Sequence, residues 1–140
     1  MKRLVASSVS VMLLTVLLFA GAHAQTADHI IKVRIPFAFE VADKTFPAGA
    51  YSLLQTAPYL ISLRDSRGHT LANLVTATVE RANISGPAKL DFYADGERYV
   101  LARVWRDHDS LGHRIPMSKR STYLAKHSAS VQVAAEGSQP

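Results

Sequence analysis

Apolar and polar residues alternate along most of the chain, in short runs separated by turn-forming residues. The first clear run covers 30–35. Pro36 then ends the strand or confines it to a sheet edge, because proline has no backbone N–H to donate. The alternation resumes with Phe37, Phe39 and Val41 and stops at an expected turn over Asp43-Lys44. A period of two over such short runs is typical of strands with one buried face.

Runs of the same kind follow, each bounded by glycine, proline or small polar residues. Pro47-Ala48-Gly49 and Asp65-Ser66-Arg67-Gly68 have the composition of turns, and the glycine of the second suits a positive φ. Residues 107–114 are mostly polar, so we expect a loop there. The pattern predicts further strands over 50–56, 59–64, 69–80, 89–94, 97–106 and 128–135, and one helix over 118–126.

Asp95-Gly96 is the strongest turn signal in the sequence, because both residues tolerate the positive φ angles of a tight hairpin. If these two residues form the turn, Tyr93 lies opposite Arg98, and Phe92 lies opposite Tyr99. Phe92 and Tyr99 then face the core, whereas Tyr93 and Arg98 form a cation–π pair on the other face. We also expect the single tryptophan, Trp105, to fill the core.

These elements predict an all-β domain, built as a small antiparallel β-sandwich or a partly open barrel with one short C-terminal helix. Both architectures use the same strand pattern, so the sequence leaves the choice between them open. The β domain is expected over 25–135. A helical signal peptide is expected over 1–24 and a disordered tail over 136–140.

The first 24 residues have the three parts of a secretory signal peptide. Lys2 and Arg3 supply positive charge, a mainly apolar stretch covers 4–20, and Ala22-His23-Ala24 is a small-x-small cleavage motif. The apolar stretch is short for a spanning helix, which needs about 20 apolar residues. We therefore expect cleavage near Ala24 and export to the periplasm or the extracellular space, with no stable membrane anchor afterwards.

Composition narrows the function classes further. The chain has no cysteine, which excludes disulfides and thiolate chemistry. Its formal net charge is +5, but Lys2 and Arg3 carry two of these charges, which leaves +3 after cleavage. The remaining basic residues are spread among acids, unlike the footprint of a nucleic-acid-binding protein. We therefore expect no nucleic-acid partner.

Two motifs near the start of the expected domain are distinctive: Ile35-Pro36-Phe37-Ala38-Phe39, and the stretch Thr-Phe-Pro-Ala-Gly-Ala-Tyr over 45–51. They resemble the IPF-x-F … LPAG-x-Y opening of a family of small uncharacterised exported proteins typical of acidobacteria. Segments 93–105 and 115–125 are also similar, so the resemblance covers most of the mature chain. It implies export but no activity, and no site residue carries over. Ser121 and Tyr123 stand where the family is expected to have acidic residues.

One polar segment combines carboxylates with imidazoles: Asp107, His108 and Asp109, followed by His113. Both groups are ligands that a divalent metal accepts. The spacing matches no zinc motif, and consecutive residues do not easily converge on one ion, so a solvated loop is the competing interpretation. These residues define the alternative function, a metal-assisted hydrolase.

Aromatic residues suggest a binding surface instead. We expect Tyr59, Tyr93 and Arg98 at the surface, where tyrosine rings can stack on sugars or contact a protein. No Gly-x-Ser-x-Gly motif of a serine hydrolase is present. The favoured interpretation is an exported β domain with a binding or structural role in the cell envelope or outside the cell. Its expected partner is a polysaccharide or an envelope protein, and it is expected to need no cofactor.

Overall fold

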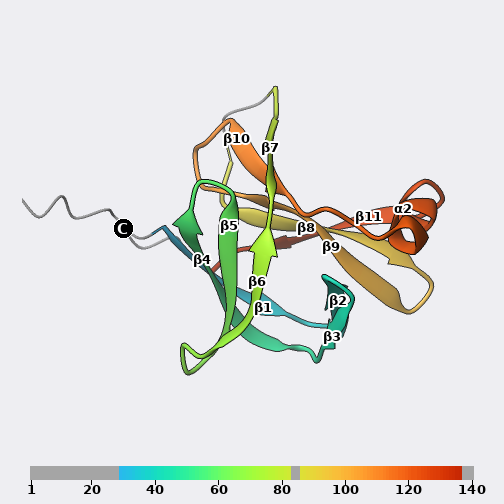
Figure 1. The fold of residues 1–140 in the computed structure, drawn as a ribbon, viewed down its shortest axis with the longest axis horizontal. Helices are drawn as coiled ribbons and strands as arrows, with labels where there is room; N and C mark the ends of the chain where they lie inside the picture. Colours follow the sequence, from blue (N-terminus) through green and yellow to red (C-terminus); the bar gives the residue numbers. More distant parts are fainter. Residues whose placement is uncertain (1–28, 83–85, 137–140) are drawn as a thin grey trace, which may run out of the picture.

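The computed structural model describes residues 29–82 and 86–136, which form two β-sheets packed against each other (Figure 1). The expected signal peptide over 1–24 lies outside the described residues, as does most of the expected tail, 137–140. Among the helices within the described ranges, none is long and apolar enough to cross a membrane. The all-β prediction is confirmed, and the sandwich is the architecture observed.

The first sheet is antiparallel, with the strand order β1-β4-β5-β6. Exposed and buried residues alternate strictly in β1, and this edge strand ends directly before Pro36, as the sequence predicts. Gly68 closes the β5–β6 turn with a φ of 87°. The strands are β1 Ile30–Ile35, β4 Gly49–Ala57, β5 Leu60–Asp65 and β6 Thr70–Val75.

The second sheet has the order β11-β8-β9-β10-β7, and the β2–β3 hairpin joins it through a parallel bridge between Glu40 and Val100. Ala42-Asp43 forms the turn of this hairpin, one residue earlier than expected, with φ angles of 48° and 60° that are typical of a type I′ turn. Its elements are β2 Phe39–Val41, β3 Lys44–Phe46, β7 Ala77–Glu80, β8 Lys89–Asp95, β9 Arg98–Trp105, β10 Leu111–Arg114 and β11 Ala129–Ala134, with helix α2 Lys119–Ala125 before β11.

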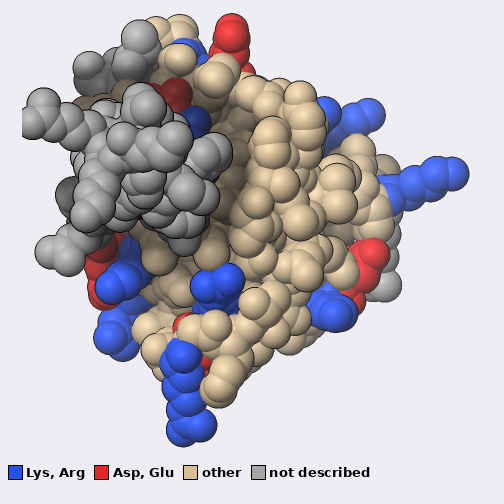
Figure 2. All heavy atoms as spheres, turned by 60° about the vertical axis from the view of Figure 1, so that its left-hand side comes forward, with Lys and Arg blue, Asp and Glu red and all other residues tan. Residues whose placement is uncertain are grey.

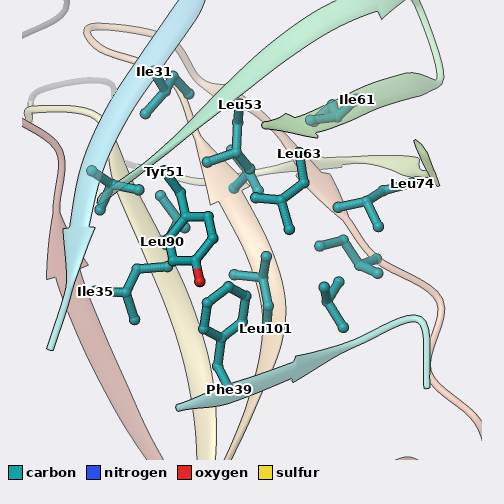
Figure 3. Packing of buried hydrophobic residues seen from close by; sticks show 14 of the residues in the cluster. Ile31, Ile35, Phe39, Tyr51, Leu53, Ile61, Leu63, Leu74, Leu90 and Leu101 are labelled. Carbon is teal, nitrogen blue, oxygen red and sulfur yellow. The ribbon is translucent and has the colours of Figure 1, made fainter. Parts of the chain in front are cut away.

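The hydrophobic core fills the space between the two sheets. Figure 3 shows Leu53 and Leu63 of the first sheet pointing toward Leu90 and Leu101 of the second, and all four are fully buried. Phe39 of β2 closes one side of the core. Truncation of such a leucine to alanine costs about 2–5 kcal/mol, so this packing contributes a large part of the stability.

The chain changes sheets in the middle of a segment expected to be one strand, 69–80. It leaves the first sheet at Val75 and enters the second at Ala77 as β7, and Figure 1 shows β7 continuing from the end of β6. Thr76 lies at the crossing, where its N–H donates to the Tyr59 carbonyl at 2.8 Å. Strands that switch sheets form corners of a sandwich, and the period-two pattern continues through such a bend.

The predicted register of the β8–β9 hairpin is wrong. Gly96-Glu97 forms the turn, because Asp95 pairs with Arg98. The φ of Gly96 is 61° and that of Glu97 is not positive, which is typical of a type II′ turn rather than the expected Asp-Gly turn. Tyr93 consequently lies opposite Val100 and not opposite Arg98.

A β-bulge further along the same hairpin brings a second change. Phe92 pairs with Leu101 and Asp91 with Arg103, so Ala102 is the extra residue on β9. The bulge turns both Leu101 and Val104 into the core, although they are three residues apart. After the bulge, Val104 faces the core, whereas simple alternation from Leu101 predicts Arg103 and Trp105 there.

Candidate functional site

A cavity of about 660 Å³ opens at one end of the sandwich, where the β4–β5 turn approaches β7 and β10 of the second sheet. A narrow crevice behind it reaches the core residues Leu53 and Val104. We call this opening the mouth cavity. Its polar and aromatic lining includes His29, Gln55, Tyr59, Thr78, Arg106 and His113.

Arg106 joins the two sheets at this opening. It directly follows β9, and one of its terminal nitrogens, Nη1, donates to Oε1 of Gln55 on β4 at 3.3 Å. The other, Nη2, forms a close ion pair with Asp109. Nε of Arg106 is buried without a hydrogen-bond partner within the described part of the chain. The guanidinium is therefore held in place at the opening, with one buried donor that has no acceptor among the described residues.

His113 lies beside Arg106 in the wall of the cavity and is only 4% exposed. Its Nδ1 forms a hydrogen bond with the hydroxyl of Thr76, the residue at the sheet crossing, at 3.1 Å. Burial lowers the pKa of His113, and the Arg106 guanidinium lowers it further, while Asp109 opposes the shift. The imidazole is therefore neutral near pH 7.

Tyr59 supplies the aromatic surface of the mouth cavity. It lies in the β4–β5 turn, and it is 62% exposed, as the sequence predicts for a surface residue. Its backbone carbonyl is held by Thr76, so the position of the residue is fixed while its ring stays open to solvent. The cavity thus combines one accessible ring with amide, guanidinium, imidazole and hydroxyl groups.

The other two expected binding residues are not brought together. Arg98 binds Glu40 of β2 through two hydrogen bonds, from Nε to Oε1 at 3.2 Å and from Nη2 to Oε2 at 2.6 Å. This pairing raises the pKa of Arg98. The Tyr93 hydroxyl instead accepts a long hydrogen bond from Arg103 at 3.4 Å. The expected Tyr93–Arg98 contact is lost because the hairpin register differs.

The four candidate metal ligands do not converge on one point. Asp109 binds Arg106, while His113 binds Thr76. His108 is an exposed residue with a φ of 49°, and its Nε2 lies 3.4 Å from the Asp107 carboxylate. Among the residues that the structure describes, no three His, Cys, Asp or Glu side chains are placed to hold one metal ion. The segment is not a continuous loop either, because β10 begins at Leu111.

Trp105 is buried, but it lies on the face of β9 away from the core, which corrects the sequence expectation. Its Nε1 donates to Oδ2 of Asp91 at 2.7 Å, and the Arg103 guanidinium lies 3.7 Å from the same oxygen. The Arg81 guanidinium lies 5.4 Å from the centre of the indole ring. Gly112 of β10 pairs with Trp105 and leaves room for the ring. We call these five residues the tryptophan cluster.

The sequence pattern points to Tyr59 and His113 but not to Gln55, Arg106 and Thr78. It suggests His113 as a metal ligand, whereas the observed contacts of His113 are a hydroxyl and the wall of a cavity. Gln55 and Arg106 are 51 residues apart and meet only because two sheets end at the same place. Arg106 is a polar residue directly after a buried strand, which is only a weak indication of a functional site.

Comparison with known proteins adds no relative: no family model matches the chain, no curated protein is similar to it, and no solved structure matches it. The resemblance to the acidobacterial family therefore stays a prediction.

Proposed function

We propose that this protein is an exported, non-catalytic binding domain that holds a sugar unit of a polysaccharide in the mouth cavity. The observation that carries the proposal is the exposed ring of Tyr59 at the rim of a concave site lined by side chains that form hydrogen bonds. A sugar ring has an apolar face that packs on an aromatic ring and hydroxyls that both donate and accept hydrogen bonds.

The polar groups support a neutral sugar better than a strongly charged ligand at this position. Arg106 is already paired with Asp109, and His113 is neutral, so the cavity carries little net charge. Gln55 and Thr78 are uncharged and can match sugar hydroxyls. Export, which the N-terminal sequence predicts, would place the domain where polysaccharides occur.

Affinity electrophoresis in gels that contain hydroxyethyl cellulose or dextran tests this proposal. We expect at least one neutral polysaccharide to retard the purified chain, and Tyr59→Ala to weaken retention at least about tenfold, the loss expected for an aromatic anchor. Tyr123→Ala is the matched control, because Tyr123 is 69% exposed on α2 and does not line the cavity. The proposal fails if no neutral polysaccharide retards the wild type, or if both variants behave alike.

A further inference from the structure

A second hollow, of about 440 Å³, lies on the outer face of the first sheet. Ser52 of β4 pairs with Lys32 of β1 on one side and with Arg64 of β5 on the other, so these three residues form a row across the sheet. Neighbouring strands lie about 4.8 Å apart, which puts the two basic residues about 10 Å from each other across the small Ser52. Arg67, in the β5–β6 turn, borders the same hollow. We call Lys32, Ser52, Arg64 and Arg67 the basic trough.

The positive charges of the trough form no ion pairs with the two acids that border the same hollow, Asp65 and Glu136. Within 29–82 and 86–136, Lys32, Arg64 and Arg67 take part in no ion pair. The acids at the edge of the hollow are occupied. Asp65 accepts hydrogen bonds from the N–H groups of its own turn, and Glu136 lies 3.5 Å from Arg34. Figure 2 shows several Lys and Arg side chains gathered on the lower part of the surface, at the height of the β5–β6 turn in Figure 1.

Arg64 is the residue of the trough best suited to bind an acid group. Its Nε is buried and has no hydrogen-bond partner in the described part of the chain, whereas the side chain as a whole is half-buried and borders the hollow. The terminal nitrogens of a planar guanidinium can bind both oxygens of a carboxylate at once, through charge-assisted hydrogen bonds.

The trough and the mouth cavity share one strand. Ala50 and Ser52 line the trough, and Leu54 and Thr56 line the mouth cavity, so alternate residues of β4 lead from one hollow to the other. Ser52 and Leu54 are two positions apart, which corresponds to about 7 Å along the strand. A chain of a few sugar units is longer than this distance. A ligand that occupies both hollows is therefore an extended polymer rather than a free anion.

We propose that the basic trough binds the carboxylates of an acidic polysaccharide, with Arg64 and Arg67 as the residues that recognise the acid groups. The choice of a saccharide over another carboxylate polymer rests on the proposed function of the mouth cavity. The basic trough itself stands independently, because none of its charged residues lines that cavity. The trough thereby selects acid groups on the polymer, while the mouth cavity holds an uncharged unit of the same chain.

Affinity electrophoresis in polygalacturonate gels tests the proposal. We expect retention of the wild type that decreases as salt rises, and at least about tenfold weaker retention for Arg64→Gln and for Arg67→Gln. Arg64→Lys keeps the charge but not the planar fork, so it should weaken retention as well. Arg114→Gln is the matched control, since Arg114 is an exposed arginine of β10 outside the trough. Thermal unfolding of each variant checks that the fold is intact, and Arg67→Gln is expected to keep the wild-type melting temperature because Arg67 lies in an exposed turn.

Three results would overturn this assignment. Equal losses for Arg114→Gln and Arg67→Gln would show a diffuse charge effect without a trough. Competition by inorganic phosphate as strong as that by polygalacturonate, or binding to vesicles of phosphatidylglycerol but not to the polymer, would assign the trough to phosphate. Absence of retention in polygalacturonate gels would show that the trough does not bind an acidic polysaccharide. If Tyr59→Ala leaves neutral-polysaccharide binding unchanged while the Arg64 variants lose polygalacturonate, the proposed function of the mouth cavity fails and the basic trough remains.

Discussion

Trp105 and Arg106 are consecutive residues at the end of β9, yet they lie in opposite kinds of environment. Trp105 is 5% exposed, its indole N–H has an acceptor, and the backbone of Gly112 is packed against its ring. Arg106 borders a cavity of about 660 Å³ and keeps one donor without a partner within the described ranges. The tryptophan cluster is thus closed to solvent, although Oδ1 of Asp91 is also buried without a hydrogen-bond partner in the described part of the chain, while the mouth cavity is open.

This difference separates residues that stabilise the fold from residues available for function. Substitutions in the tryptophan cluster should lower the free energy of unfolding, because every removed group leaves a buried partner behind. Substitutions at the rim of the mouth cavity should leave stability nearly unchanged and alter binding instead. Three measurements test where the boundary between the two regions lies.

The largest expected effect comes from Gly112→Ala. A Cβ at this position would lie 2.6 Å from Cζ3 of Trp105 and closer still to Cε3, so the ring or the strand must move. We expect the free energy of unfolding to decrease by about 3 kcal/mol, the upper range for overpacking a filled site. Chemical denaturation measures this change.

Gly49→Ala is the control for this substitution. A Cβ there would meet only the Tyr51 ring at 3.6 Å, an ordinary contact, so we expect a change below about 1 kcal/mol. A Gly112→Ala variant as stable as Gly49→Ala would mean that the indole is not confined by β10.

A smaller loss is expected when the acceptor of the indole is removed. Asp91→Leu leaves the buried Nε1 of Trp105 unpaired and should cost about 2 kcal/mol, whereas Asp91→Asn retains an acceptor oxygen and should cost about half as much. Denaturation curves of both variants, monitored by the single tryptophan, measure the difference. Equal stability of Asp91→Leu and wild type would show that this hydrogen bond contributes nothing.

The smallest effect depends on pH and concerns His113. Burial and the Arg106 guanidinium lower its pKa in the folded protein, so below a pH of about 6.5 the unfolded chain takes up a proton that the folded chain does not. Stability should therefore fall as pH decreases below that value, by at most about 1.4 kcal/mol per pH unit, and level off below the folded pKa.

His113→Asn should show a flatter dependence of the unfolding free energy on pH between about pH 7.5 and 5. His108→Asn is the control, because His108 is 79% exposed and its removal should keep the wild-type slope. Parallel curves for wild type and His113→Asn would place the pH dependence elsewhere and show that the mouth cavity does not keep this imidazole neutral.

Local sequence pattern was sufficient for most of the longer strands, although β10 lies in a segment expected to be a loop and 69–80 divides into two strands. The alternation in β1, the stop before Pro36 and the positive φ of Gly68 were all expected and are all observed. Tyr59 is exposed as expected, but it lies in the turn before β5 and not in the strand predicted over 59–64. Each of these features depends on neighbours within a few residues, which is the range over which periodicity and turn chemistry act.

The register of the β8–β9 hairpin could not be predicted from the local sequence. Gly96 can occupy either central position of a tight turn, and the local sequence does not show which one packs better. The bulge at Ala102, which turns Leu101 and Val104 to the same side, is decided by the core that both must fill. The location of Trp105 outside the core follows from this bulge, because the extra residue Ala102 reverses which side chains at the end of β9 face the core.

By itself, the sequence determined the fold class, most strand positions and the prediction of export, because hydrophobic periodicity and turn residues are local properties. Only the tertiary structure decided that 69–80 divides between two sheets at Thr76 and that Gln55, Arg106 and His113 meet at one opening. The basic trough likewise exists only through the pairing of Lys32 and Arg64 with Ser52. Alternation specifies which side chains share a face of a strand, but the faces that come together are chosen by long-range packing of the whole chain.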